Sequence, residues 1–132
     1  MKYLLDTNVC IRYLNGQSIA IRDKIRSLNP DDIVLCSVVK SELYFGACKS
    51  NRPEKTLSKL EPFLAFFKSL PFDDLAARVY GKVRSELEKD GTPIGPYDLQ
   101  IASIALANNL ILVTHNVREF SRVSGLVIED WE

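Results

Sequence analysis

The chain has 132 residues, of which 46% are hydrophobic and 26% are charged. This composition is typical of one folded domain spanning 1–132 and excludes a disordered segment. The 17 basic and 17 acidic side chains give a formal net charge of zero, which excludes a uniformly basic nucleic-acid-binding surface. Binding to RNA or DNA would need a local patch, a metal ion or a second protein.

The first residues do not combine a basic segment with an apolar run, so no signal peptide is expected. No apolar run approaches the roughly 20 residues that cross a bilayer. The three cysteines, Cys10, Cys36 and Cys48, have no CxxC spacing and lie within apolar periodic stretches. They are predicted to be buried free thiols in a reducing compartment. Together these features predict a soluble cytoplasmic protein without a membrane partner.

Short apolar runs alternate with helical periodicity along the chain. The first half predicts a strand at 2–5, helices at 9–14 and 18–28, a strand at 31–37, and a helix at 38–50 with Ser37 as N-cap. The second half predicts a helix at 53–68, a strand at 69–72, a helix at 75–90 capped by Asp73 or Asp74, a helix at 97–109, a strand at 110–116, a helical turn at 117–120 and a strand at 125–131. This alternation is typical of an α/β domain whose mostly parallel sheet has helices on both faces, a three-layer arrangement.

Polar side chains directly follow three of the predicted strands. Asp6 follows the first strand, Ser37 the second, and residues 114–116 (Thr-His-Asn) end the strand that begins at 110. The carboxyl ends of parallel strands meet at one edge of the sheet, where ligands bind. Asp6 is therefore either a cap for the next helix or part of a site shared with acids from other segments.

Glu42 is an acid in an unusual helical position. It lies one to two turns into the helix at 38–50, beside Val38, Val39 and Phe45. An unpaired carboxylate on such an apolar face is costly. The alternative is a solvated edge position or a pair with Lys49.

Asp98 lies in the first turn of the helix at 97–109, where the helix dipole stabilises an acid. Ile101, Ala102 and Ala105 share its face, which turns the carboxylate towards the edge of the sheet. The first-turn position alone is a sufficient structural explanation. The small apolar face below it favours a place in a shared site.

Asn116 and Glu119 begin the helical turn at 117–120 with the spacing of a capping box, and they also follow a predicted strand. Acids from separate segments that meet at one sheet edge repel one another unless a cation lies between them. Oxygen ligands without a Cys/His set favour Mg²⁺ or Mn²⁺ over zinc. A divalent ion held by carboxylates suits hydrolysis of a phosphodiester or phosphate.

Four stretches of the sequence resemble the PIN-domain ribonucleases, and more narrowly the VapC toxins of bacterial toxin–antitoxin pairs. They are 4–9 (LLDTNV), 41–47 (SELYFGA), 91–102 (GTPIGPYDLQIA) and 112–131 (LVTHNVREFSRVSGLVIEDW). The last two are specific and most resemble the branch that cleaves initiator tRNA in its anticodon loop. The resemblance implies a PIN-like three-layer fold and a metal-dependent endoribonuclease.

The resemblance also implies roles for individual residues. The acidic triad that holds Mg²⁺ or Mn²⁺ corresponds to Asp6, Glu42 and Asp98. Thr7 would orient the first acid or its water. Asn116 stands where many members have aspartate, and it offers a neutral oxygen without a charge. Glu119 is either the acid that replaces this charge or part of a structural turn.

The partners implied by the resemblance are tRNA, a second copy of the chain in a homodimer, and a cognate VapB-type antitoxin that covers the acidic site and often joins two dimers. Two other readings stay open. One is a catalytically silent binding module whose acids are caps or pairs, and the other is a nuclease that acts on DNA. His115 is either a general base or a histidine hydrogen-bonded to backbone at a strand end.

Overall fold

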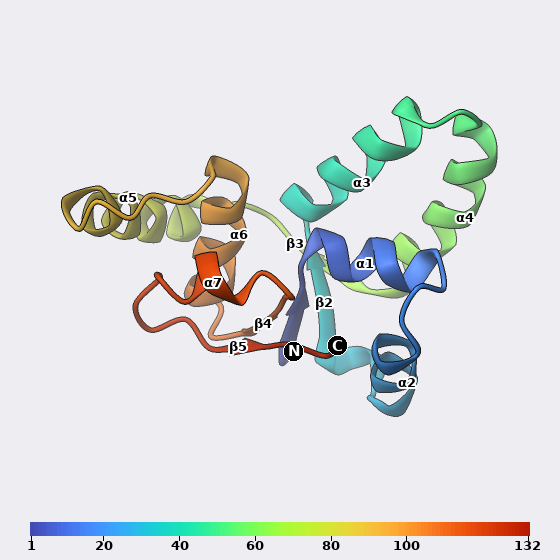
Figure 1. Cartoon of the computed structure of the whole chain (residues 1–132), viewed down its shortest axis with the longest axis horizontal. Coiled ribbons are helices and arrows are strands. Elements are labelled where there is room, and N and C mark those ends of the chain that lie inside the picture. The colour runs from blue at the N-terminus through green and yellow to red at the C-terminus, as the bar shows by residue number, and fades with distance from the viewer.

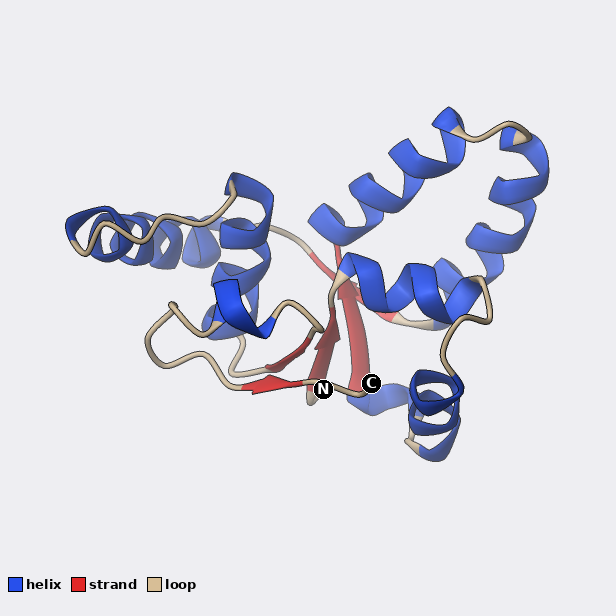
Figure 2. Ribbon diagram, viewed as in Figure 1, coloured by secondary structure: helices blue, strands red, loops and turns tan.

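The computed structural model describes residues 1–132 and contains a parallel five-stranded sheet between two groups of helices (Figures 1 and 2). The strands are β1 (Tyr3–Leu5), β2 (Ile33–Cys36), β3 (Lys68–Leu70), β4 (Ile111–Val113) and β5 (Ile128–Glu129). The helices are α1 (Thr7–Leu14), α2 (Ile19–Ser27), α3 (Ser37–Lys49), α4 (Pro53–Phe66), α5 (Asp74–Lys89), α6 (Pro96–Ala107) and α7 (Val117–Phe120). The predicted three-layer α/β class is confirmed.

The order of strands in the sheet is β3-β2-β1-β4-β5, and every neighbouring pair is parallel. Strand β1 is central, with β2 on one side and β4 on the other. Figure 1 shows α1 to α4 on one side of the central strands and α5 to α7 on the other. The chain therefore changes direction across the sheet between β1 and β4, and the crevice at such a switch point is the usual ligand site of a parallel sheet.

The central strands are buried on both faces, which explains their continuous apolar sequences. Leu4, Leu5, Val34, Leu35 and Leu112 are all fully buried. Helix α6 is apolar nearly all round, and it is deeply buried from Leu99 to Ala105 except at Gln100, whereas its first turn lies near the surface. None of the helices is long and apolar enough to cross a membrane.

Most element predictions are confirmed, and the differences lie at the ends. The predicted strand at 31–37 begins later because Pro30–Asp32 form a 3₁₀ turn. The last predicted strand is shortened to two residues. Asp73 caps α5 by accepting a hydrogen bond from the Ala76 N–H at 2.9 Å, as predicted.

The prediction that Ser37 is an N-cap is wrong. Ser37 is the first residue of α3, Cys36 takes the cap position, and no side chain caps this helix. The Ser37 hydroxyl donates instead to the Leu70 carbonyl at 3.4 Å, at the end of β3. Because β2 runs directly into α3, the helix starts one residue earlier than the sequence pattern indicates.

The cysteine prediction is confirmed for two residues and wrong for the third. Cys10 and Cys36 are buried free thiols, and burial raises the pKa of Cys36 to about 11, so its thiol stays protonated. Cys48 is free but exposed. Apolar residues surround α3 on several sides, so its sequence pattern does not mark which side faces the core.

Trp131 closes the fold by packing on Tyr3 of the central strand. The centroids of the two rings are 5.2 Å apart in an edge-to-face arrangement, and Trp131 is 8% exposed. Replacing Trp131 by alanine is expected to lower the free energy of unfolding by about 3 kcal/mol, because a large buried ring is removed. Urea unfolding measures this loss, with Phe66→Ala as the control because Phe66 is 66% exposed. Equal losses in the two variants would contradict the prediction.

Candidate functional site

Asp6 is the centre of the site and combines two roles that the sequence left as alternatives. It is the N-cap of α1, and its Oδ1 accepts a hydrogen bond from the Thr7 N–H at 2.8 Å. Its Oδ2 accepts one from the Thr114 hydroxyl, also at 2.8 Å. The side chain is only 5% exposed, and burial raises its pKa against the opposing effect of these two bonds. The carboxylate is thus fixed in orientation at the switch point.

Glu42 reaches the same site from α3. The Thr7 hydroxyl donates to Glu42 Oε1 at 3.1 Å, which joins the start of α1 to the second turn of α3. Desolvation raises the pKa of Glu42, the Thr7 bond lowers it, and the negative charge of Asp6 raises it. Glu42 therefore faces Asp6, and it forms no ion pair with Lys49.

Asp98, in the first turn of α6, is the acid whose ionisation the site opposes most clearly. Its pKa is raised to about 7, first by desolvation and then by the negative charges of Asp6, Glu119 and Glu42. The Glu119 side chain therefore lies beside the Asp98 carboxyl. The four acids are therefore close enough for their charges to influence the ionisation of Asp98. They come from separate segments, namely the starts of α1, α6 and α7 and the second turn of α3.

Asn116 and Glu119 form a link of their own beside Asp98. Asn116 Nδ2 donates to Glu119 Oε2 at 3.0 Å, and the Asn116 N–H donates to the Thr114 hydroxyl, also at 3.0 Å. The predicted capping-box spacing is present, but the Asn116 side chain makes no capping bond to α7. It holds Glu119 instead, so Glu119 belongs to the acidic neighbourhood and is more than part of a turn.

The charge of this site is not balanced within the chain. None of the ion pairs in the structure includes Asp6, Glu42, Asp98 or Glu119. Buried and half-buried carboxylates that repel one another and lack a basic partner fit a bound cation, and their oxygens suit Mg²⁺ or Mn²⁺. The donor chemistry of these residues therefore fits a divalent metal ion, but their ligand atoms do not all lie within 4.8 Å of one another, so a bound ion would draw them closer together.

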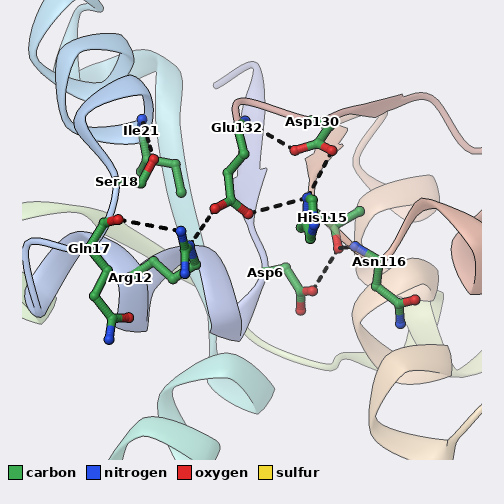
Figure 3. A network of polar contacts seen from close by, with 10 residues as sticks. Asp6, Arg12, Gln17, Ser18, Ile21, His115, Asn116, Asp130 and Glu132 are labelled. Atoms are coloured by element: carbon green, nitrogen blue, oxygen red, sulfur yellow. Dashed lines mark hydrogen bonds and ion pairs between the residues drawn. The ribbon is translucent and has the colours of Figure 1, made fainter.

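A second polar network lies next to this site at the end of the chain (Figure 3). His115 Nδ1 is 3.0 Å from Asp130 Oδ2 and 3.3 Å from Glu132 Oε2, and Arg12 pairs with Glu132. The prediction of a His115 bond to backbone is wrong, because its partners are these carboxylates. His115, Asp130 and Glu132 are the one His/Cys/Asp/Glu triplet whose ligand atoms all lie within 4.8 Å. The Arg12 guanidinium already balances part of their charge.

Thr114 is a site residue whose role sequence reasoning missed. It is fully buried at the end of β4, where it donates to Asp6 and accepts from the Asn116 N–H. Its position after an apolar strand was visible in the sequence. Its partner was not, because Asp6 is 108 residues away along the chain. Thr114 is a positioning residue that ties the end of β4 to Asp6.

Thr114→Val is expected to weaken Mn²⁺ binding by about 10- to 100-fold, a loss typical of a residue that orients a metal ligand. Valine keeps the shape of threonine but leaves the Asp6 oxygen and the Asn116 N–H without their partner, so stability should also fall by about 1–3 kcal/mol. Mn²⁺ titrations and thermal unfolding of Thr114→Val and Thr114→Ser measure both effects. Serine keeps the hydroxyl, so equal defects in the two variants would contradict this role.

The fold and the site together define a PIN-like α/β domain, with carboxylates gathered at the carboxyl ends of the central strands. The model of the PIN domain family matches residues 3–126, and the chain belongs to this family.

Two curated proteins are similar over nearly the whole chain. The tRNA(fMet)-specific endonuclease VapC of Shigella flexneri is 41% identical over 131 residues, covering 99% of this chain and 98% of that protein. Ribonuclease VapC2 of Rickettsia felis is 38% identical over 133 residues, covering 100% and 99%. Among solved structures, a chain of the DNA-bound VapBC complex of Salmonella typhimurium matches with a TM-score of 0.95 and 41% identity, covering 100% of this chain and 99% of that chain.

Proposed function

We propose that the chain is a metal-dependent endoribonuclease toxin that cleaves initiator tRNA in its anticodon loop and is neutralised by a VapB-type antitoxin. The observation that carries the proposal is the set of carboxylates without counter-ions at the switch point. It occurs in a chain 41% identical to a tRNA(fMet)-specific endonuclease. A tRNA substrate puts the reaction in the cytoplasm.

The metal would be held by Asp6, Glu42 and Asp98. A bound Mg²⁺ or Mn²⁺ polarises a phosphate oxygen and lowers the pKa of its water. Asp6 is suited to be a fixed ligand because both of its oxygens are oriented by hydrogen bonds. Glu42, held by the Thr7 hydroxyl, completes the shell or positions the attacking water. Hydrolysis then joins the water oxygen to phosphorus as the bond from phosphorus to the leaving ribose oxygen breaks.

Asn116 and Glu119 have supporting roles in this proposal. Asn116 donates through its Nδ2 to Glu119, which leaves its Oδ1 available to accept a hydrogen bond from a metal-bound water. Glu119 supplies the negative charge that aspartate gives many family members at the position of Asn116. Its side chain lies beside Asp98, so it is suited to orient Asp98 towards the metal.

The antitoxin partner is inferred from the relatives and from the charge of the site. Similar structures include VapBC complexes from Salmonella typhimurium and Rickettsia felis. An uncompensated acidic site on a chain of zero net charge would attract a cationic side chain of a partner. Such a side chain would take the place of the metal and silence the nuclease. A homodimer, joined to a second dimer through the antitoxin, is part of the same proposal.

The test is cleavage of purified total tRNA by the folded, antitoxin-free protein, with Mn²⁺ and with EDTA. Asp98→Asn is the inactive variant, and Asp74→Asn is the matched control because Asp74 is an exposed first-turn acid of α5. Products are located on a sequencing gel. Cleavage in one loop of one tRNA, lost with EDTA and in Asp98→Asn but kept in Asp74→Asn, is the expected result.

Two other outcomes would overturn the proposal. Intact RNA in every lane would favour a binding module whose acids are caps and pairs. Metal-dependent cutting of single- or double-stranded DNA, with RNA left intact, would assign the same acids to a deoxyribonuclease.

A further inference from the structure

A groove between α1, α3 and α4 reaches the acidic site at Glu42. It encloses a cavity of about 410 Å³, and Glu42 is part of its lining. The same Glu42 is bonded to Thr7 beside Asp6. A strand whose phosphate is bound at the carboxylates therefore enters this groove when it continues towards α4. Figure 1 shows α3 and α4 as the two arms of a helical hairpin above α1.

The lining of the groove changes character along its length. Leu14, Leu43 and Leu60 give it an apolar floor, whereas Lys55 and Lys59 provide two cations at its α4 wall. These lysines are four residues apart on one helix and therefore share a face. Both are exposed, and neither takes part in an ion pair within the chain. A single nucleic-acid strand offers the matching pattern of phosphates and apolar base faces.

The walls of the groove are fixed by contacts between the two arms. Tyr44 on α3 donates to Glu61 on α4 at 3.1 Å. Ser50 and Thr56 share a hydrogen bond of 3.0 Å at the turn between the helices. The groove is therefore formed before any ligand binds, which reduces the ordering cost of binding.

Gly46 lines the groove, and packing within the free protein does not explain why this position is glycine. It lies inside α3, where glycine lowers helix stability relative to alanine. Apart from its chain neighbours and the backbone of its own helix, a Cβ atom built at Gly46 would meet nothing within 4 Å, so close packing in the chain does not require glycine. The space that it leaves belongs to the groove. A ligand that approaches the α3 backbone closely would account for it.

We propose that this groove holds the RNA strand next to the cleaved phosphodiester, with Lys55 and Lys59 on its phosphates and Gly46 giving room for a nucleoside. The proposal rests on the proposed ribonuclease function and names the surface that binds its substrate. A polyanionic strand is favoured over a peptide, because the unpaired lysines would repel the cationic side chain that the acidic site attracts.

The first experiment compares steady-state tRNA cleavage, with Mn²⁺, by wild type and Lys55→Ala/Lys59→Ala over a range of KCl concentrations. The double variant should raise KM by about 10-fold or more with little change in kcat, because it removes binding and not chemistry. The slope of log kcat/KM against log salt should fall by about 1.4, which is about 0.7 for each lost phosphate contact on a single strand. Lys82→Ala/Lys89→Ala on α5 is the matched control and should change neither.

The second experiment uses two glycine variants as a pair. Gly46→Ala and Gly81→Ala both fill open space inside a helix, and both should raise Tm by roughly 2–4 °C. Only Gly46→Ala should raise KM for tRNA, because only Gly46 lines the groove. This combination of higher stability and weaker substrate binding is not expected from a purely structural role.

The results distinguish this proposal from the function on which it rests. Absence of cleavage by wild type would reject the ribonuclease function itself. If the wild type is active but KM and its salt dependence are unchanged in Lys55→Ala/Lys59→Ala, the groove proposal alone is overturned. The groove would then be assigned to a peptide partner. Equal KM values for Gly46→Ala and Gly81→Ala would likewise overturn the proposal that a nucleoside occupies the space beside Gly46.

Discussion

Asp6→Asn is expected to slow RNA cleavage by about 10³-fold or more, which is the scale of losing a group that acts directly on the reacting centre. Asp6 is buried at the switch point, and both of its oxygens are oriented by hydrogen bonds. Asparagine keeps the volume but removes the charge that would hold the metal. It also puts an amide N–H where the site already supplies two donors.

Single-turnover cleavage of tRNA with saturating Mn²⁺ measures this effect without a contribution from product release. Circular dichroism and thermal unfolding show whether the variant keeps its fold. Asp74→Asn makes the same chemical change on the exposed side of α5 and should cleave like wild type. A folded Asp6→Asn protein that cleaves within about tenfold of wild type would show that the reaction occurs elsewhere.

The stability of the metal-free protein should depend on the proton held by Asp98. The pKa of Asp98 is raised to about 7 in the folded chain from an ordinary value of 3.8, so between these pH values the folded state binds a proton that the unfolded state has lost. The free energy of unfolding contributed by Asp98 therefore falls as pH rises from about 4 to 7. Relative to wild type, Asp98→Asn should be about 1–2 kcal/mol more stable at pH 8 and similar at pH 4, since solvent screens a half-buried carboxylate.

Mn²⁺ should reverse this effect, because it replaces the repulsion among the acids with attraction. At a metal concentration 100 times Kd, the wild type should gain about 2.7 kcal/mol of stability at pH 8. Below pH 7 the proton on Asp98 competes with the metal, and the apparent affinity should fall about tenfold per pH unit. Both the gain and its pH dependence should disappear in Asp98→Asn.

Thermal unfolding of the two proteins, with EDTA and with increasing Mn²⁺ from pH 4 to 8, measures these quantities together. Subtracting the Asp98→Asn curve removes the titration of other carboxylates. Equal Mn²⁺ stabilisation of both proteins would place the metal away from Asp98. A wild type that becomes more stable than Asp98→Asn as pH rises without metal would contradict the raised pKa.

The sequence by itself determined the elements of the fold and the acids that begin them. Continuous apolar runs identify strands that are covered on both faces, and helical periodicity identifies the intervening helices. Asp6 follows such a run directly, and Asp98 lies in the first turn of an apolar helix. These features depend on residues close together in the chain, so local pattern is sufficient to find them.

Only the tertiary structure decided which of these residues meet. The strand order brings β4 next to β1, and this neighbourhood gives Asp6 the hydroxyl of Thr114 as a partner. It also places Glu119, which was predicted as either an acid of the site or part of a turn, beside Asp98. The hydrogen-bond partner of His115 is a carboxylate and not a backbone group. Periodicity reports which face of an element is buried, but not what covers that face. The partners of a buried polar group are fixed by packing between distant segments, and that information is distributed over the whole chain.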